Sequence, residues 1–299
     1  NERIAAQLFA ITGGTPAYRT LARGGAPHDE RSFARWVCSN PLSSSSPLFR
    51  EAHYLLTEDL DVRDPLVYNS ILSAAATGST TRTAIATQVG RKVTDIAHHL
   101  SVLESTGYLP KVDDAFSTRK PRWHIADQII RFDRAVMKPA WSRLSTTNDP
   151  APTWELQQGA FRSQVLGPQF KDMCRDWVQS HADPSRFNAE AITRVAPAVV
   201  SMGGRDQAEI DVVVFGVVAG RTMLVSIGEC KWSETVTPAH VARLERVRSR
   251  LGASGIDVSR TSLAFYSGQR RGTGVRGDTP AGLKHVDIAE IYGAPADSA

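Results

Sequence analysis

The chain has 299 residues, a formal net charge of +4 and 41% hydrophobic residues. This length predicts two or three domains, each with a buried core. No apolar run approaches the length of a membrane span and no signal peptide opens the chain, so we expect no membrane partner. Cys38, Cys174 and Cys230 lie far apart without a CxxC pair, which argues against a cysteine zinc site and favours a cytoplasmic location.

Positive charge is concentrated in the middle of the chain. Residues 67–145 contain eleven Lys and Arg against six Asp and Glu, a balance of +5, so the remainder is close to neutral. This asymmetry favours a polyanion such as DNA as a partner. A solvated basic surface would give the same balance.

Residues 1–63 are predicted to form a helical segment with irregular connections. Apolar residues recur at helical spacing over residues 4–11, and the run Gly13-Gly14-Thr15-Pro16 then stops the helix. Two further short helices are expected over residues 33–37 and 47–60, on either side of a serine-rich loop.

Residues 64–145 are predicted to form a winged helix followed by one more helix. The expected elements are helices over 66–76, 83–89 and 93–105, strands over 109–112 and 123–125, and a last helix over 126–144. Three helices followed by a hairpin with a basic loop is the order of a winged helix-turn-helix. Residues 145–152 have the composition of a linker, so we place a domain boundary there.

The third helix of a winged helix enters the major groove of DNA. We therefore predict DNA contacts from the start and the exposed side of that helix and from the basic loop, namely Arg91, Lys92, Thr94, His98, Arg119, Lys120 and Arg122. The third helix carries few basic residues beyond its start, so a protein-interaction or spacer module is the alternative.

Residues 153–299 are predicted to form a domain with the order α-β-β-β-α-β. The expected elements are a helix over 169–178, strands over 192–200, 208–215 and 224–232, a helix over 238–251, a strand over 261–267 and a last short element over 286–292. The glycines 216 and 220 are expected to form the turn between the second and third strands. The whole chain is therefore predicted to be an α+β multidomain protein.

Two of these strands carry charged residues, which are unusual in strands that are otherwise apolar. Asp211 lies in the first, and Glu229 and Lys231 lie at the end of the second. Because strand side chains alternate between faces, Glu229 shares a face with Lys231, and Glu209 shares one with Asp211. Carboxylates from adjacent strands can hold Mg²⁺ or Mn²⁺ and polarise a phosphate. A structural ion pair is the alternative interpretation.

This D…ExK pattern in the order α-β-β-β-α-β resembles the PD-(D/E)XK nuclease superfamily, which has a restriction-endonuclease-like fold. The resemblance implies that Asp211 and Glu229 hold the metal and that Lys231 stabilises the transition state. It also implies a Glu on the preceding helix, where this chain reads Phe170-Lys171, and Glu209 is the residue that could compensate. Arg243 and Arg246 are candidates for contacts to phosphates near this site, with a solvated helix face as the alternative.

A second resemblance covers nearly the whole chain. It rests on four short motifs and the helix-turn-helix segment between them, the motifs being residues 13–18, 124–132, 209–211 and 228–232. Together they resemble the C-terminal part of archaeal-type AAA/STAND ATPases, with a helical lid (1–63), a winged helix (64–145) and a nuclease-like domain (153–299). The chain contains no GxxxxGK[ST] motif, so the resemblance implies that ATP would bind to an ATPase core upstream of Asn1.

Two functional hypotheses result. The first is the C-terminal portion of an ATPase-coupled protein that binds DNA and cleaves its phosphodiester bonds with a Mg²⁺-dependent, endonuclease-like domain. The second is a non-catalytic DNA- or protein-binding regulatory module with a degenerate nuclease fold. Lys171 is the residue that favours the second hypothesis.

Overall fold

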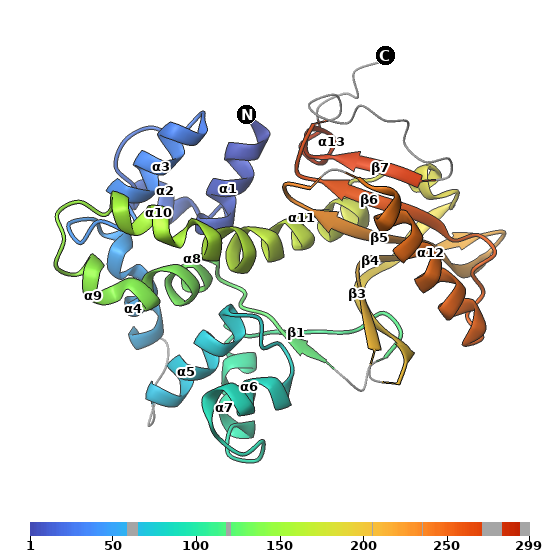
Figure 1. Cartoon of the computed structure of the whole chain (residues 1–299), viewed down its shortest axis with the longest axis horizontal. Helices are drawn as coiled ribbons and strands as arrows, with labels where there is room; N and C mark the ends of the chain where they lie inside the picture. Colours follow the sequence, from blue (N-terminus) through green and yellow to red (C-terminus); the bar gives the residue numbers. More distant parts are fainter. Residues whose placement is uncertain (59–64, 118–120, 205, 235, 271–282, 294–299) are drawn as a thin grey trace. The chain divides into compact units, whose positions relative to one another are not determined.

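The computed structural model of the chain describes residues 1–58, 65–117, 121–204, 206–234, 236–270 and 283–293. The chain has an α+β fold that divides into two compact units (Figure 1). We call residues 1, 3–112 and 121–168 the helical unit, and residues 2, 113–120 and 169–299 the sheet unit. Among the described residues, no helix combines the length and apolar character needed to cross a membrane.

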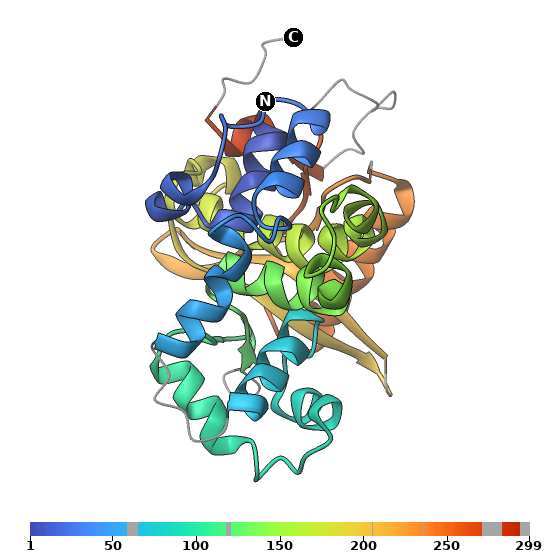
Figure 2. The ribbon, with the colours of Figure 1, turned by 90° about the vertical axis from the view of Figure 1, so that its left-hand side faces the viewer.

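The helical unit is built from short helices and one two-stranded ladder, and Figure 2 shows its helices coloured from blue to green. Its elements are α1 (Glu2–Thr12), α2 (Pro16–Leu21), α3 (Glu30–Ser39), α4 (Leu48–Glu58), α5 (Pro65–Ala76), α6 (Arg82–Val89), α7 (Ala97–Ser105), β1 (Lys111–Val112), β2 (Arg122–Trp123), α8 (Gln128–Phe132), η1 (Asp133–Met137), η2 (Lys138–Ala140), α9 (Trp141–Leu144), α10 (Ala151–Ala160) and η3 (Phe161–Leu166). Phe161 packs against Phe33 and Phe132, with ring centroids 5.8 and 6.1 Å apart, and so joins α3 and α8 in one core.

The predicted stop after the first helix brings two distant motifs together. Gly13 ends α1 with a φ of 60°, a left-handed conformation that glycine adopts without strain. A Cβ at this position would lie 2.3 Å from the Oε1 atom of Gln128. The Tyr18 hydroxyl also donates a hydrogen bond of 3.1 Å to Asp127, whose other carboxylate oxygen caps α8. The turn after α1 is therefore fixed against the start of α8.

The helix expected over residues 93–105 begins later than predicted, at Ala97. The Thr94 hydroxyl donates to the Asp95 carboxylate over 3.0 Å, a local bond that competes with helix formation. No side chain caps the helix start at Ile96. Thr94 therefore lies in the turn before α7 and not on the helix.

The helix expected over residues 126–144 is helical in four pieces, α8, η1, η2 and α9. Pro139 lies in η2 and has no N–H to donate to the preceding turn, so a regular α-helix cannot run through it. The predicted helix is therefore present from Gln128 to Leu144, but it is not a regular α-helix throughout.

The boundaries between the two units differ from the boundaries expected between three domains. Residues 145–152 lie within the helical unit, and α10 already begins at Ala151. From α10 the chain stays helical through the π-helical turn η3 and into α11 (Gly167–Ser180), with the division falling after Pro168. Residues 113–120 separate from their expected domain and belong to the sheet unit.

The sheet unit has the element order α-β-β-β-α-β that the sequence predicts, followed by one more strand and a short helix. After α11 these elements are η4 (Pro184–Phe187), β3 (Ala191–Gly203), β4 (Asp206–Val218), β5 (Arg221–Lys231), α12 (Pro238–Ala253), β6 (Ser262–Ser267), β7 (Leu283–Asp287) and α13 (Ile288–Ile291). The strands form one mixed sheet in the order β3-β4-β5-β6-β7. The first three strands are antiparallel, and β5, β6 and β7 are parallel.

The turn between β4 and β5 is tighter than predicted. Val218 pairs with Arg221, so only Ala219 and Gly220 form the loop, both with positive φ (48° and 72°). Two such residues make the type I′ turn that matches the twist of a hairpin. Gly216 lies within β4 and not in the turn, and a Cβ there would approach the carbonyl oxygen of residue 191 to 2.8 Å.

The two long helices of the sheet unit cover opposite faces of the sheet. Leu244, Val247 and Leu251 of α12 pack in one core with Ile227 and its neighbours, and α12 lies in front of the sheet in Figure 1. Residues of β5 alternate between faces, so Cys230 and Trp232 point to the other side. There the Trp232 ring meets Phe170 of α11 edge-on, with centroids 5.3 Å apart.

The basic loop expected after β1 is described over residues 113–117, and this part is bound to β3 and does not project into solvent. Asp114 accepts a hydrogen bond of 2.7 Å from the Val199 N–H of β3, and the N–H of Ala115 donates to the Pro197 carbonyl over 2.8 Å. The loop therefore covers the outer edge of β3. Arg119 and Lys120 lie outside the described residues.

Candidate functional site

Asp211 lies in a β-bulge of β4, which is flanked by β3 and β5. On β3, Ala196 pairs with Val213 and Ala198 pairs with Ile210, so Pro197 alone stands opposite both Asp211 and Val212. Proline has no N–H for the ladder, so a bulge opposite it costs no hydrogen bond from that residue. Bulges redirect side chains, and here the redirected side chain is a carboxylate in an otherwise apolar strand.

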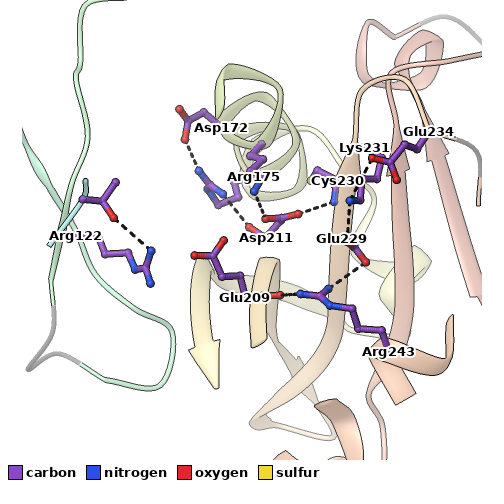
Figure 3. A network of polar contacts seen from close by, with 12 residues as sticks. Arg122, Asp172, Arg175, Glu209, Asp211, Glu229, Cys230, Lys231, Glu234 and Arg243 are labelled. Atoms are coloured by element: carbon purple, nitrogen blue, oxygen red, sulfur yellow. Dashed lines mark hydrogen bonds and ion pairs between the residues drawn. The ribbon is translucent and has the colours of Figure 1, made fainter. Parts of the chain in front are cut away.

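Both carboxylate oxygens of Asp211 already have partners within the sheet unit. Lys171 of α11 holds one oxygen, with its Nζ 2.7 Å from Oδ1, and the backbone N–H of Cys230 donates to Oδ2 over 2.8 Å. Arg175 donates to the Asp211 main-chain carbonyl over 2.8 Å, so α11 binds this residue twice. Figure 3 shows Asp211 between Arg175 and Cys230. Only 8% of Asp211 is exposed to solvent.

The two cations come from one face of α11. Lys171 and Arg175 are four residues apart, which places them one above the other on a helix. Arg175 also pairs with Asp172 of the same helix. Burial by itself would lower the pKa of Lys171, but the charge and the hydrogen bond of Asp211 oppose burial, and the net result is a raised pKa. Lys171 therefore stays charged at neutral pH.

Glu229 has cationic partners of its own. Its Oε1 lies 3.4 Å from Nζ of Lys231, and its Oε2 lies 3.1 Å from Nη1 of Arg243 on α12. The Arg243 contact is an ion pair without the geometry of a hydrogen bond, since Glu229 Oε2 is buried and has no hydrogen-bond partner among the described residues. Arg243 does donate a hydrogen bond of 2.8 Å, to the main-chain carbonyl of Glu209.

The same network extends beyond β5 to the start of α12. Lys231 lies 3.5 Å from Glu234, and Glu234 lies 3.5 Å from His240. Figure 3 shows Lys231 between Glu229 and Glu234. The three carboxylates of Asp211, Glu229 and Glu234 are thus matched by three cations, those of Lys171, Lys231 and Arg243.

Of the predicted catalytic residues, Asp211 and Glu229 lie close together on the paired strands β4 and β5, but their side chains contact different helices. Val212 pairs with Gly228, so Asp211 and Glu229 are the next residues outward on the two strands. Asp211 contacts α11, whereas Glu229 contacts α12. Across the described ranges, no three His, Cys, Asp or Glu side chains gather in a way that could hold a metal ion. Glu209 therefore does not complete a set of three with Asp211 and Glu229.

The other predicted contact residues are mostly exposed. Arg91, Lys92, Thr94 and His98 are exposed in and around the turn that leads into α7. Arg122 on β2 donates a 3.4 Å hydrogen bond to Thr80. In the sheet unit, Arg246 is exposed on α12, whereas Arg243 is engaged with Glu229 and Glu209.

Sequence reasoning did not identify Lys171 as the partner of Asp211 or Arg243 as a partner of Glu229. The four-residue spacing of Lys171 and Arg175 was the available signal for one of these contacts. Cys174 lies on the same helix, and its thiol is hydrogen-bonded to that of Cys230. Burial and the neighbouring thiol raise the pKa of Cys230, so the Cys230 thiol stays protonated at neutral pH.

Comparisons with protein-family models, with curated proteins and with solved structures find no match to this chain.

Proposed function

We propose that this chain is a DNA-binding protein. Its sheet unit is a nuclease-like module in which the protein's own cations take the place of a divalent metal. One observation carries this proposal: the ammonium of Lys171 lies 2.7 Å from the buried Asp211 carboxylate, where a metal-dependent nuclease would need a cation-free ligand. Three isolated cysteines, all with free thiols, are in keeping with a cytoplasmic protein.

The carboxylates of the site do not fit Mg²⁺ or Mn²⁺ as they stand. Mg²⁺ requires several oxygen ligands in near-octahedral geometry. Asp211 offers no oxygen that is not already bonded to Lys171 or Cys230, and Glu229 lies between Lys231 and Arg243. A metal would have to displace at least one cation from each carboxylate. The site instead satisfies its own negative charges with side chains.

The helical unit supplies the surface proposed to bind DNA. Its elements α5, α6, α7, β1 and β2 follow each other in the order of a winged helix, which supports that assignment. Arg91 and Lys92 are exposed in the connection between α6 and α7, the helix proposed to enter the major groove. Basic side chains at that place would neutralise phosphates and make binding depend strongly on salt.

DNA affinity measured by fluorescence anisotropy in EDTA tests this proposal. The wild type should bind a duplex, and replacing EDTA by Mg²⁺ at equal ionic strength should leave the affinity unchanged. The Arg91→Ala/Lys92→Ala double variant should bind at least about tenfold more weakly, with the slope of log K against log salt reduced by about 2. Arg260→Ala is the matched control, because Arg260 is exposed in the sheet unit and should not affect DNA affinity. An unchanged DNA affinity of the double variant would contradict the proposal that the helical unit binds DNA.

A second candidate function is Mg²⁺-dependent cleavage of DNA by the sheet unit. The observation in its favour is that Asp211 and Glu229 follow the Val212–Gly228 pair on adjacent strands, with Lys231 3.4 Å from Glu229. In this candidate Asp211 and Glu229 would hold the metal, and Lys231 would stabilise charge on the phosphate. A supercoiled plasmid distinguishes the two functions. Cleavage that requires Mg²⁺ or Mn²⁺ and disappears in Asp211→Ala and Lys231→Ala would establish the nuclease.

We also propose that residues 1–58 and 65–145 correspond to the lid and the winged helix of an AAA/STAND ATPase. The support is the contact of Gly13 with Gln128 and of Tyr18 with Asp127, which joins two of the motifs shared with that family. ATP would then bind to a core outside this chain. An ATP analogue should accordingly show no binding to this chain by calorimetry, and saturable binding would contradict the assignment.

A further inference from the structure

We infer that Lys171 is a tethered cation that takes the place of a divalent metal at Asp211 and keeps metal away from this carboxylate. The inference rests on the proposed function, in which the sheet unit has no divalent metal. It adds that Lys171 is the residue that keeps the metal out. Removing Lys171 should turn Asp211 into a site for Mn²⁺ or Mg²⁺.

The position of Asp211 requires a cation. The Asp211 side chain is 10% exposed and lies in an apolar strand, and Arg175 holds its main-chain carbonyl with a hydrogen bond of 2.8 Å. A buried charge without a partner is strongly unfavourable. Of its two oxygens, the Cys230 N–H satisfies one, and among the described residues the Lys171 ammonium is the charged group bonded directly to the other.

Lys171 can be removed without emptying the core, because its side chain is 37% exposed and reaches Asp211 from the rim of α11. Solvent already reaches part of this side chain, so its removal opens a route for a dissolved ion to Asp211. Phe170 meets Trp232 directly after β5 and Cys174 meets Cys230 of β5, and both contacts are independent of Lys171. The change therefore removes a charge and leaves the packing of α11 intact.

Thermal melting of the full chain in EDTA and in about 10 mM MnCl₂ tests the inference. Lys171→Ala should melt several degrees below the wild type in EDTA, and Mn²⁺ should restore at least half of that loss. The wild type should not respond to Mn²⁺. Lys171→Arg keeps a cation beside Asp211, so it should melt like the wild type and ignore Mn²⁺. Arg260→Ala is the matched control for the loss of an exposed positive charge.

Lys171→Glu provides a second comparison. It places a carboxylate next to Asp211, so it should be less stable than Lys171→Ala in EDTA and should bind Mn²⁺ at least about tenfold more tightly. If Lys171→Ala is too unstable to melt, Lys171→Gln takes its place in the comparison, because its neutral amide can still donate a hydrogen bond to Asp211.

Three results would overturn the inference. These are an equal rise in melting temperature for the wild type and Lys171→Ala, no response of either Lys171 variant to Mn²⁺, and a response that persists when Asp211→Asn is added to Lys171→Ala. DNA affinity in EDTA is measured on the same proteins. A wild type that fails to bind DNA would refute the proposed function and leave the role of Lys171 standing.

Discussion

At the scale of single residues, the partners of Asp211 decide what the sheet unit can do. Lys171 neutralises one of its oxygens and the Cys230 N–H satisfies the other, while Arg175 holds its carbonyl. Asp211, Glu229 and Lys231 could be predicted from sequence because charges in apolar strands are conspicuous. Lys171 and Arg243 could not be identified as their partners, because the contacts depend on how α11 and α12 lie against the sheet.

The Lys171–Asp211 pair predicts how stability depends on alkaline pH. The folded protein has a raised Lys171 pKa, so the pair stabilises the fold fully below the pKa of an unfolded lysine, about 10.4. The contribution is lost as pH rises through the higher folded value. Between pH 9 and about 11.5, the wild type should lose more thermal stability than Lys171→Arg, whose guanidinium stays charged. Melting curves that fall in parallel for both proteins would contradict this account.

At the scale of elements, the packing of β5 depends on Gly228, the residue before Glu229, having no side chain. A Cβ at Gly228 would lie 2.7 Å from the Cε2 atom of Tyr266 and 3.1 Å from the carbonyl oxygen of Ala264. Tyr266 is completely buried, so its ring has no space to move into. The parallel pairing of β5 and β6 therefore requires glycine at this position.

Gly228→Ala should destabilise the protein by about 1–3 kcal/mol, the usual cost of overpacking a filled core. Chemical denaturation of the full chain measures this free energy of unfolding. Gly159→Ala is the control, because Gly159 lies in α10 with no atom within 4 Å of a Cβ, and alanine is the better helix former by about 1 kcal/mol. A Gly228→Ala protein as stable as the wild type would show that Tyr266 can move.

The elements themselves were predictable to different degrees. Strongly patterned segments such as α5, α12 and the hairpin of β4 and β5 could be read from their periodicity and turn residues. The start of α7 and the break at Pro139 were missed because a local side-chain bond and a single missing N–H outweighed an otherwise helical pattern. The bulge at Asp211 is set by Pro197 on another strand, and no pattern near Asp211 indicates it.

At the scale of the whole molecule, the chain combines a helical unit with a basic segment and a sheet unit whose charges are paired internally. The basic balance of residues 67–145 could be read from composition, and the exposure of Arg91, Lys92 and His98 agrees with it. The division into units could not be predicted from linker composition. Helix α10 begins within the expected linker, and residues 113–120 belong to the sheet unit because Asp114 and Ala115 bind β3.

The proposed DNA binding and the metal-free sheet unit predict different responses to ions. Binding to DNA should weaken steeply as monovalent salt increases from about 50 to 200 mM, because Lys and Arg displace counterions from the phosphates. Divalent metal should act only as additional salt. Anisotropy titrations in NaCl, with and without MgCl₂ at matched ionic strength, measure this difference.

The central claim is that the protein's own cations, and not a divalent metal, neutralise Asp211 and Glu229. Calorimetric titration of the wild type with MnCl₂ tests it most directly, in the presence and absence of duplex DNA. The account predicts no saturable binding up to about 1 mM, the range in which weak divalent sites fill, and intact DNA at the end of the titration. Saturable binding that is lost in Asp211→Ala, accompanied by cleavage of the duplex, would contradict it.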